Sequence, residues 1–213
     1  MTSSSLRGLQ AALVFGVAAL AGCGGAGGDV DYLAEAEALL LDARWDEAIP
    51  LLREHLLRNP QDPGAHFYLG RAYMFGSSGL LGHALGEFQT ALYYFHRDGG
   101  ESPIERFSDT YFELACHVES AKVYLQIALV FLEMPEPPSQ LLHALAECHR
   151  VLERAREVDP EAPEVQELEL HLTTLREEAE ARLGPPEDWP EEHRAPLPVP
   201  EPELPRDRDR FSI

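Results

Sequence analysis

The chain has 213 residues and a formal net charge of −20, from 37 acidic and 17 basic residues. A surface this acidic repels phosphates, so nucleic acid is excluded as a partner. The length and the 45% content of hydrophobic residues are sufficient for one hydrophobic core.

Residues 1–22 have the layout of a secretory signal peptide. Arg7 precedes an apolar run from Ala11 to Ala21, which is too short for a permanent transmembrane helix. The run ends in Leu20-Ala21-Gly22-Cys23, which resembles the lipobox of bacterial lipoproteins. The resemblance implies cleavage before Cys23 and acylation of this residue, and several acyl chains give stable membrane anchoring. The alternative is an ordinary signal peptide followed by a coincidental cysteine.

The lipidated Cys23 and a Gly-rich tether make up residues 23–28, and such a tether is flexible. In some bacteria, an Asp directly after the lipidated Cys retains a lipoprotein in the inner membrane. This chain has Gly24 at that position. The resemblance therefore implies a lipoprotein of the outer membrane that faces the periplasm.

Residues 29–183 are predicted to be helical, and the stretch 44–60 shows the pattern most clearly. Its apolar residues recur at spacings of three and four, which is typical of an amphipathic helix. We expect Asp46 to cap the start of this helix. Asn59-Pro60 ends it, because a residue before Pro avoids helical geometry. Asp62-Pro63 then predicts the start of the next helix, with Asp62 as its cap and Pro63 at its first position.

The same pattern recurs along the chain. Ala48 and Leu52 match Ala84 and Phe88 after 36 positions, Tyr32, Ala36 and Leu39 match His66, Gly70 and Tyr73 after 34, and Cys148, Leu152, Ala155 and Val158 form a third copy of the second half. Helical hairpins that repeat after about 34 residues, with small residues where helices meet, resemble the tetratricopeptide repeat. The resemblance implies an α-solenoid, in which Gly70 allows close approach of a partner helix. An unrelated helical bundle is the alternative.

The third hairpin is predicted to be longer than a tetratricopeptide repeat. Ser102-Pro103-Ile104-Glu105 has the pattern of a capping box, and no helix breaker follows before Glu133. This segment is either one long helix or one that bends near Ser108-Asp109. It is mostly apolar but contains Glu113, Glu119 and Lys122, which argues against a membrane span and for a buried central helix.

The last predicted helix ends at Leu183 and has one apolar stripe and otherwise acidic faces. The stripe consists of Val165, Leu168, Leu172, Leu175, Ala179 and Leu183. Such a helix is suited to cap a solenoid. Residues 184–213 are rich in Pro, so we expect a disordered or polyproline II tail that acts as a spacer or docks a partner through Pro202-Glu203-Leu204-Pro205.

No catalytic motif and no metal-ligand spacing is found, so we expect no enzyme, cofactor or metal site. Cys116 and Cys148 are predicted on successive antiparallel helices at heights that differ by roughly 10 Å. That difference exceeds the reach of a disulfide. We expect both cysteines to pack between helices.

The resemblance implies that the first helix of each hairpin lines a groove that binds a partner. The candidate residues are Leu33, Glu37, Leu40, Phe67, Arg71 and Met74. Arg71 is the sharpest candidate, because a guanidinium group in an apolar groove can hold a carboxylate through two hydrogen bonds. The alternatives are core packing for Phe67 and Met74, and an intramolecular ion pair for Arg71.

The leading hypothesis is a lipid-anchored cell-envelope scaffold that binds an unidentified envelope protein or peptide segment. The alternative is a module that binds a small ligand or catalyses a reaction in a pocket at the long third hairpin. The aromatic residues expected at that pocket are Phe88, Tyr93, Phe107, Tyr111 and Phe112. A structural envelope protein without a groove is a third possibility.

Overall fold

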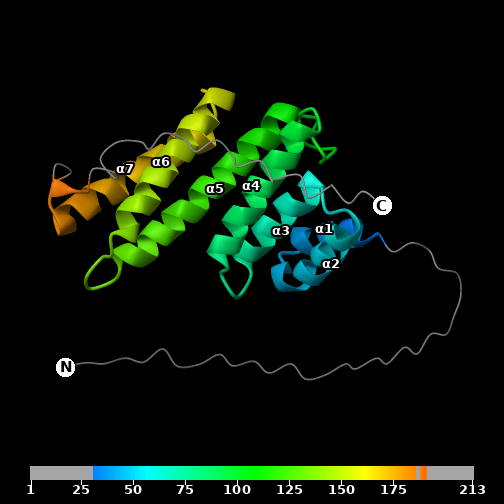
Figure 1. The fold of residues 1–213 in the computed structure, drawn as a ribbon, viewed down its shortest axis with the longest axis horizontal. Helices are drawn as coiled ribbons and strands as arrows, with labels where there is room; N and C mark the ends of the chain where they lie inside the picture. Colours follow the sequence, from blue (N-terminus) through cyan, green and yellow to red (C-terminus); the bar gives the residue numbers. More distant parts are fainter. Residues whose placement is uncertain (1–30, 186–187, 191–213) are drawn as a thin grey trace, which may run out of the picture. The chain divides into compact units, whose positions relative to one another are not determined.

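The computed structural model describes residues 31–185 and 188–190. The regular structure within these ranges consists of seven α-helices (Figure 1): α1 (Tyr32–Leu41), α2 (Trp45–Arg58), α3 (Pro63–Phe75), α4 (Leu81–Arg97), α5 (Asp109–Leu132), α6 (Gln140–Val158) and α7 (Pro163–Leu183). The predicted all-α class is therefore confirmed. The predicted signal peptide, Cys23, the tether and residues 191–213 lie outside the described residues.

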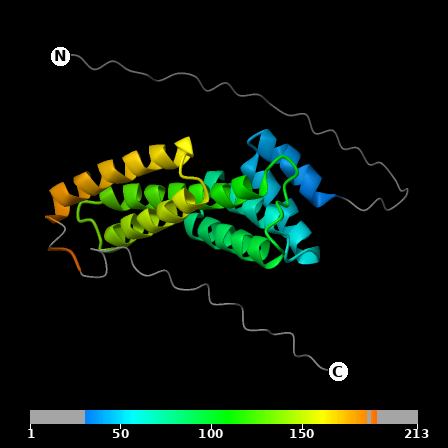
Figure 2. The ribbon, with the colours of Figure 1, turned by 90° about the horizontal axis from the view of Figure 1, so that it is seen from above.

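Each helix packs against the next helix in the chain, from α1 to α7. The first helices of the hairpins also contact one another, because α1 touches α3, α3 touches α5 and α5 touches α7. Figures 1 and 2 show the resulting series of helices lying side by side. This arrangement buries the apolar stripe of each helix against its neighbours, since no hairpin covers both of its own helices.

A side chain caps the start of three of the described helices, which are α1, α3 and α5. Asp31 accepts a hydrogen bond from the amide of Ala34 at 3.1 Å, and Asp62 accepts one from Ala65 at 3.0 Å. Asp62 precedes Pro63, the first residue of α3, where the missing N–H costs nothing. The predicted Asp62-Pro63 start is thus confirmed.

The prediction that Asp46 caps α2 is wrong. The helix begins at Trp45, and its N-cap residue Arg44 makes no capping hydrogen bond through its side chain. The Asp46 carboxylate instead accepts the backbone N–H of Ser77 at 3.0 Å. It therefore fastens the first turn of α2 to the turn after α3, a contact between residues far apart in sequence.

The predicted capping box at Ser102 is also wrong. The α5 helix begins at Asp109, after the capping residue Ser108, whose hydroxyl accepts the amide of Tyr111 at 3.1 Å. The Ser102 hydroxyl donates to the carbonyl of Ile104 within the preceding loop. Ile104 is buried, and its insertion into the core holds this loop out of helical geometry.

The close approach of α3 and α4 depends on Gly70, as predicted. A Cβ atom at Gly70 would lie 2.7 Å from Cε1 of Phe88, although carbon atoms normally stay about 3.5–4.0 Å apart. Phe88 is completely buried. The absent side chain therefore makes room for the Phe88 ring.

Two hydrophobic clusters form the core, and α5 contributes to both. One cluster joins α1–α4 to Phe112, Cys116 and Val123, and the other joins α5 to α6 and α7. On length and composition alone α5 is able to cross a membrane, yet half of its apolar window is buried inside the domain. The predicted burial of this helix at the centre is confirmed.

The predicted stripe of α7 is buried from Val165 to Ala179. The packed region continues past α7, because Trp189 is only 3% exposed and its Nε1 donates to the carbonyl of Gly184 at 2.9 Å. The predicted start of a loose tail at Gly184 is therefore too early. The indole ring buries enough apolar surface to hold this segment against the core.

Candidate partner-binding site

Three of the predicted groove residues belong to the hydrophobic core. Leu40 is 9% exposed, Phe67 2% and Met74 6%. The Phe67 ring lies 5.6 Å from that of Phe112 and 5.8 Å from that of Phe88. These side chains are inaccessible in this arrangement, which agrees with the core-packing alternative for Phe67 and Met74.

Glu37 of α1 is half-buried and belongs to a polar network centred on Tyr68 of α3. The Tyr68 hydroxyl accepts a hydrogen bond from Nη2 of Arg106 at 3.0 Å and interacts with the Glu37 carboxylate. Burial and the Glu37 carboxylate both raise the pKa of Tyr68. We call these three residues the Tyr68 network, and it joins α1, α3 and the loop before α5.

Arg71 lies one turn further along α3, against two aromatic rings. Its guanidinium carbon is 5.7 Å from the ring centre of Trp45 and 5.8 Å from that of Phe75. The two ring centres are 5.0 Å apart. We call Trp45, Arg71 and Phe75 the Arg71 cluster. Stacking of this kind attracts the cation and restricts its orientation.

The hydrogen-bonding groups of Arg71 are not used within the described part of the chain. Its Nε is buried without a partner, and no carboxylate there lies within the 4.0 Å of an ion pair. The intramolecular ion pair considered above is therefore not observed. Because Nε is enclosed, only the two terminal nitrogens of this guanidinium are left to hydrogen-bond to another molecule.

Four residues around Arg71 and Glu37 were not predicted from the sequence as part of the candidate site: Trp45, Phe75, Tyr68 and Arg106. Arg71 and Phe75 are four positions apart, a spacing that brings side chains together on a helix. That spacing was the available signal for Phe75. Trp45 and Arg106 come from other elements, so no local pattern relates them to α3.

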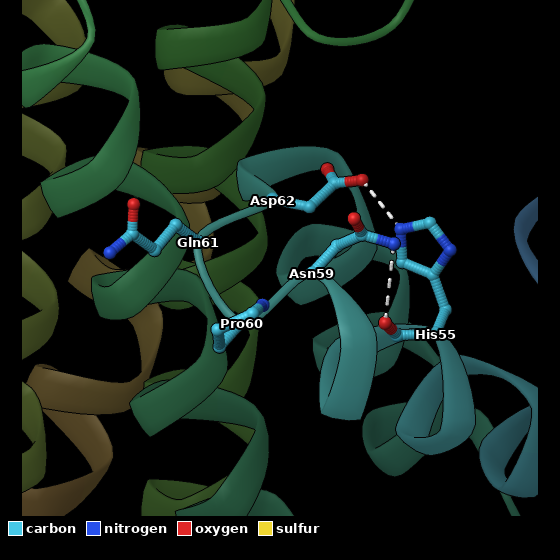
Figure 3. A pocket seen from close by; sticks show the side chains of 5 residues that line it. All are labelled: His55, Asn59, Pro60, Gln61 and Asp62. Atoms are coloured by element: carbon cyan, nitrogen blue, oxygen red, sulfur yellow. Dashed lines mark hydrogen bonds and ion pairs between the residues drawn. The ribbon is translucent and has the colours of Figure 1, made fainter.

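A second surface feature lies at the turn between α2 and α3 (Figure 3). His55, Asn59, Pro60, Gln61 and Asp62 line an open depression of about 440 Å³. His55 Nε2 is 2.8 Å from Asp62 Oδ2, and the same carboxylate caps α3. Asp62 is thus occupied by two structural contacts, and the arrangement offers no activated nucleophile.

The aromatic residues proposed for a ligand pocket pack against one another. Phe88 and Phe112 are completely buried. The ring centre of Phe112 is 5.1 Å from that of Phe95, and Phe107 is 4.7 Å from Tyr111. Phe88 and Phe112 therefore belong to the core, whereas Tyr93 and Phe107 are half-buried and Tyr111 is 45% exposed.

Cys116 and Cys148 are both buried, unbridged thiols. Cys148 Sγ donates to the carbonyl of Ala121 at 3.6 Å, which fixes it between α5 and α6. Burial raises the pKa of Cys148 to about 12. Both side chains act as small apolar residues at helix contacts. Within residues 31–185 and 188–190, no group of three or more metal-binding side chains converges.

Comparison of the chain with protein-family models, curated proteins and solved structures finds no match.

Proposed function

We propose that this chain is a non-enzymatic, lipid-anchored scaffold of the bacterial cell envelope, which binds a protein partner on a helical-repeat surface. One observation carries the proposal. In a chain with 37 acidic and 17 basic residues, Arg71 is partly exposed and stacked on two rings, yet it pairs with none of the described carboxylates. Such a group is suited to bind a carboxylate of another protein.

The proposed architecture is a tetratricopeptide-like solenoid with a long third hairpin and α7 as its cap. The contacts of α1 with α3, α3 with α5 and α5 with α7 support it, because first helices stack on one another in such a solenoid. The fit of Phe88 against Gly70 further supports it. The apolar stripe of α7 is suited to terminate the stack.

The proposed site combines a charged contact at Arg71 with an apolar contact at Phe75. The terminal nitrogens of Arg71 hold a partner carboxylate, and Phe75, which is 41% exposed, contacts the neighbouring apolar part of the partner. Glu37 interacts with Tyr68 in the neighbouring Tyr68 network. We therefore leave Glu37 out of the proposed contact with the partner. Of the predicted groove residues, Leu33, Glu37 and Arg71 remain at least partly exposed.

The proposed anchor is Cys23, joined to the helices by the Gly-rich tether of residues 23–28. A tether of this composition leaves the helical domain free to turn relative to the membrane. The acidic surface is repelled by anionic lipid headgroups. Both properties suit a domain that projects into the periplasm, with the outer membrane as the proposed location.

Crosslinked pull-downs from membranes test the partner site with wild type, Arg71→Glu and Arg176→Glu. Reversing a charge that holds a carboxylate costs at least roughly 2–5 kcal/mol, which corresponds to about 30-fold or more in Kd. We expect the partner to be lost with Arg71→Glu and kept with Arg176→Glu, which makes the same charge change on α7. Equal recovery with both variants removes Arg71 from the site, and the absence of any partner with wild type contradicts the scaffold proposal.

The anchor is tested by Cys23→Ser in cells fed labelled palmitate. The variant lacks the thiol that accepts lipid, so we expect an unlabelled precursor. A variant that still incorporates palmitate and partitions with membranes excludes lipidation at this residue.

A further inference from the structure

Two histidines in this domain occupy opposite electrostatic environments. His66 of α3 faces hydrogen-bond acceptors on both ring nitrogens, whereas His117 of α5 is buried beside cationic groups. The first environment favours the charged imidazolium ion, and the second favours the neutral ring. The proposed partner-binding function uses neither residue.

His66 fastens α3 to α4 and to the turn before α3. Its Nδ1 lies 2.6 Å from Glu87 Oε2 of α4, and its Nε2 lies 3.1 Å from the carbonyl oxygen of Pro60. A neutral imidazole has one N–H group and satisfies only one of these two acceptors. Both contacts are hydrogen bonds only when the ring carries two protons.

The other charged and aromatic groups around His66 do not reverse the preference of its ring for the charged form. Asp62 of the preceding turn adds a second negative charge, and this is the smallest of the effects on His66; the same carboxylate also lies 2.8 Å from His55 Nε2. The ring stacks on Tyr94 of α4 at 5.6 Å, and Arg97 lies over that tyrosine, but Arg97 is paired with Asp98. Burial lowers the pKa of His66, but Glu87, the Pro60 carbonyl and Asp62 outweigh it, so the pKa is raised.

His117 lies where α5 meets α4 and α6, and it is 7% exposed. Arg154 faces it from α6 and His96 faces it from α4. Glu113, one turn earlier on α5, is 3.3 Å from His96 and thus occupied. Among the residues with known placement, none accepts a hydrogen bond from the His117 ring. Burial, followed by the electrostatic effects of Arg154 and His96, lowers the pKa of His117 to about 4.

We propose that these two histidines give two junctions of the helical array, that of α3 with α4 and that of α5 with α4 and α6, opposite responses to pH. Acid strengthens the junction of α3 and α4 through His66 and weakens the junction of α5 with α4 and α6 through His117. Near neutral pH the balance is reversed. Acid therefore lowers the free energy needed to open the α5–α6 hairpin and raises the free energy needed to separate α3 from α4.

The direction of each effect follows from proton linkage. The ordinary pKa of 6.5 for histidine applies to the opened chain. Stability from His66, whose pKa is raised, is present below pH 6.5 and is lost as the pH rises through the folded-state pKa. Stability from neutral His117 is present above pH 6.5 and is lost as the pH falls toward 4.

Native-state hydrogen exchange, resolved by peptide and corrected for intrinsic rates, tests the proposal on the full chain. Between pH 7.5 and 5.0, linkage at His117 raises the opening constant of α5–α6 peptides by about 30-fold. We expect α3–α4 peptides to become better protected over the same range. A change in the same direction for α3–α4 and for α5–α6 peptides, or a single pH response for all helices, overturns the proposal.

Single substitutions assign the two responses. His117→Leu should remove the acid response of α5–α6 alone, and His66→Gln should remove that of α3–α4 alone. His149→Gln is the matched control, because His149 is partly exposed on α6 beside Glu153, and it should change neither response. An unchanged response in His117→Leu or His66→Gln contradicts the assignment.

An NMR titration of the wild-type rings does not depend on the folding of any variant. We expect the His66 ring to titrate above pH 6.5 and the His117 ring to remain neutral at pH 5. A His117 ring that is charged at pH 5, or a His66 ring that titrates below pH 6.5, overturns the proposal.

Discussion

Replacement of Gly70 by Ala tests the packing of α3 against α4 directly. The new methyl group would lie 2.7 Å from Cε1 and 2.8 Å from Cδ1 of Phe88. Phe88 is completely buried, and its ring centre lies 5.8 Å from that of Phe67, so it has no open space to enter. Overpacking of this kind costs about 1–3 kcal/mol.

Gly86→Ala on α4 is the matched control. Gly86 is exposed, and a Cβ atom there would have no neighbour within 4 Å. Ala is favoured over Gly inside a helix by about 1 kcal/mol, and this gain applies to both substitutions. Gly86→Ala should therefore raise the free energy of unfolding by about 1 kcal/mol, and Gly70→Ala should fall about 1–3 kcal/mol below it.

Urea unfolding followed by far-UV circular dichroism measures these differences, with equal m-values as the check on a common unfolding reaction. In a Phe88→Leu background the smaller side chain leaves room, so Gly70→Ala should cost less there than in the wild type. Equal stability of Gly70→Ala and Gly86→Ala, or the absence of coupling to Phe88, would refute the proposed close approach.

Further predictions concern other parts of the helical array. Asp46→Ala removes the acceptor for the Ser77 amide and should lower the free energy of unfolding by about 1 kcal/mol, as measured by urea unfolding; no change would show that the contact adds nothing. Leu172→Ala truncates a buried residue of α7 and should cost about 2–5 kcal/mol, whereas Leu170→Ala, at a residue 67% exposed, should stay within about 0.5 kcal/mol. Because burial raises the pKa of Cys148 to about 12, its thiol should react with a disulfide reagent at pH 8 far more slowly in the native than in the unfolded protein; similar rates would contradict its burial.

The proposed pH responses and the proposed partner site involve different parts of the domain. The Arg71 cluster is built on α2 and α3, next to the α3–α4 junction that His66 is proposed to strengthen in acid. His117 acts at the third hairpin. A partner bound at Arg71 should therefore remain bound when acid loosens α5 and α6, provided that the partner contacts only the first hairpins.

Features set by neighbouring residues were predictable from the sequence alone. The apolar period of three and four identified the helices, and Asp62-Pro63 marked the start of α3, because capping depends on residues within one turn. The small residue Gly70 was recognised as a contact point, and the stripe of α7 identified its buried face. These properties are local, since helical periodicity determines which side chains share a face.

Only the tertiary structure decided which distant groups meet. Asp46 is of a residue type that often caps helices, but the packing of α2 against α3 brings the Ser77 amide to its carboxylate. Arg71 was equally suited to an intramolecular ion pair, and the position of Trp45 on α2 placed it on aromatic rings instead. Trp189 follows a Pro-rich composition, yet it fills the core beside α7. Such contacts depend on helix packing, which the local chain pattern does not specify.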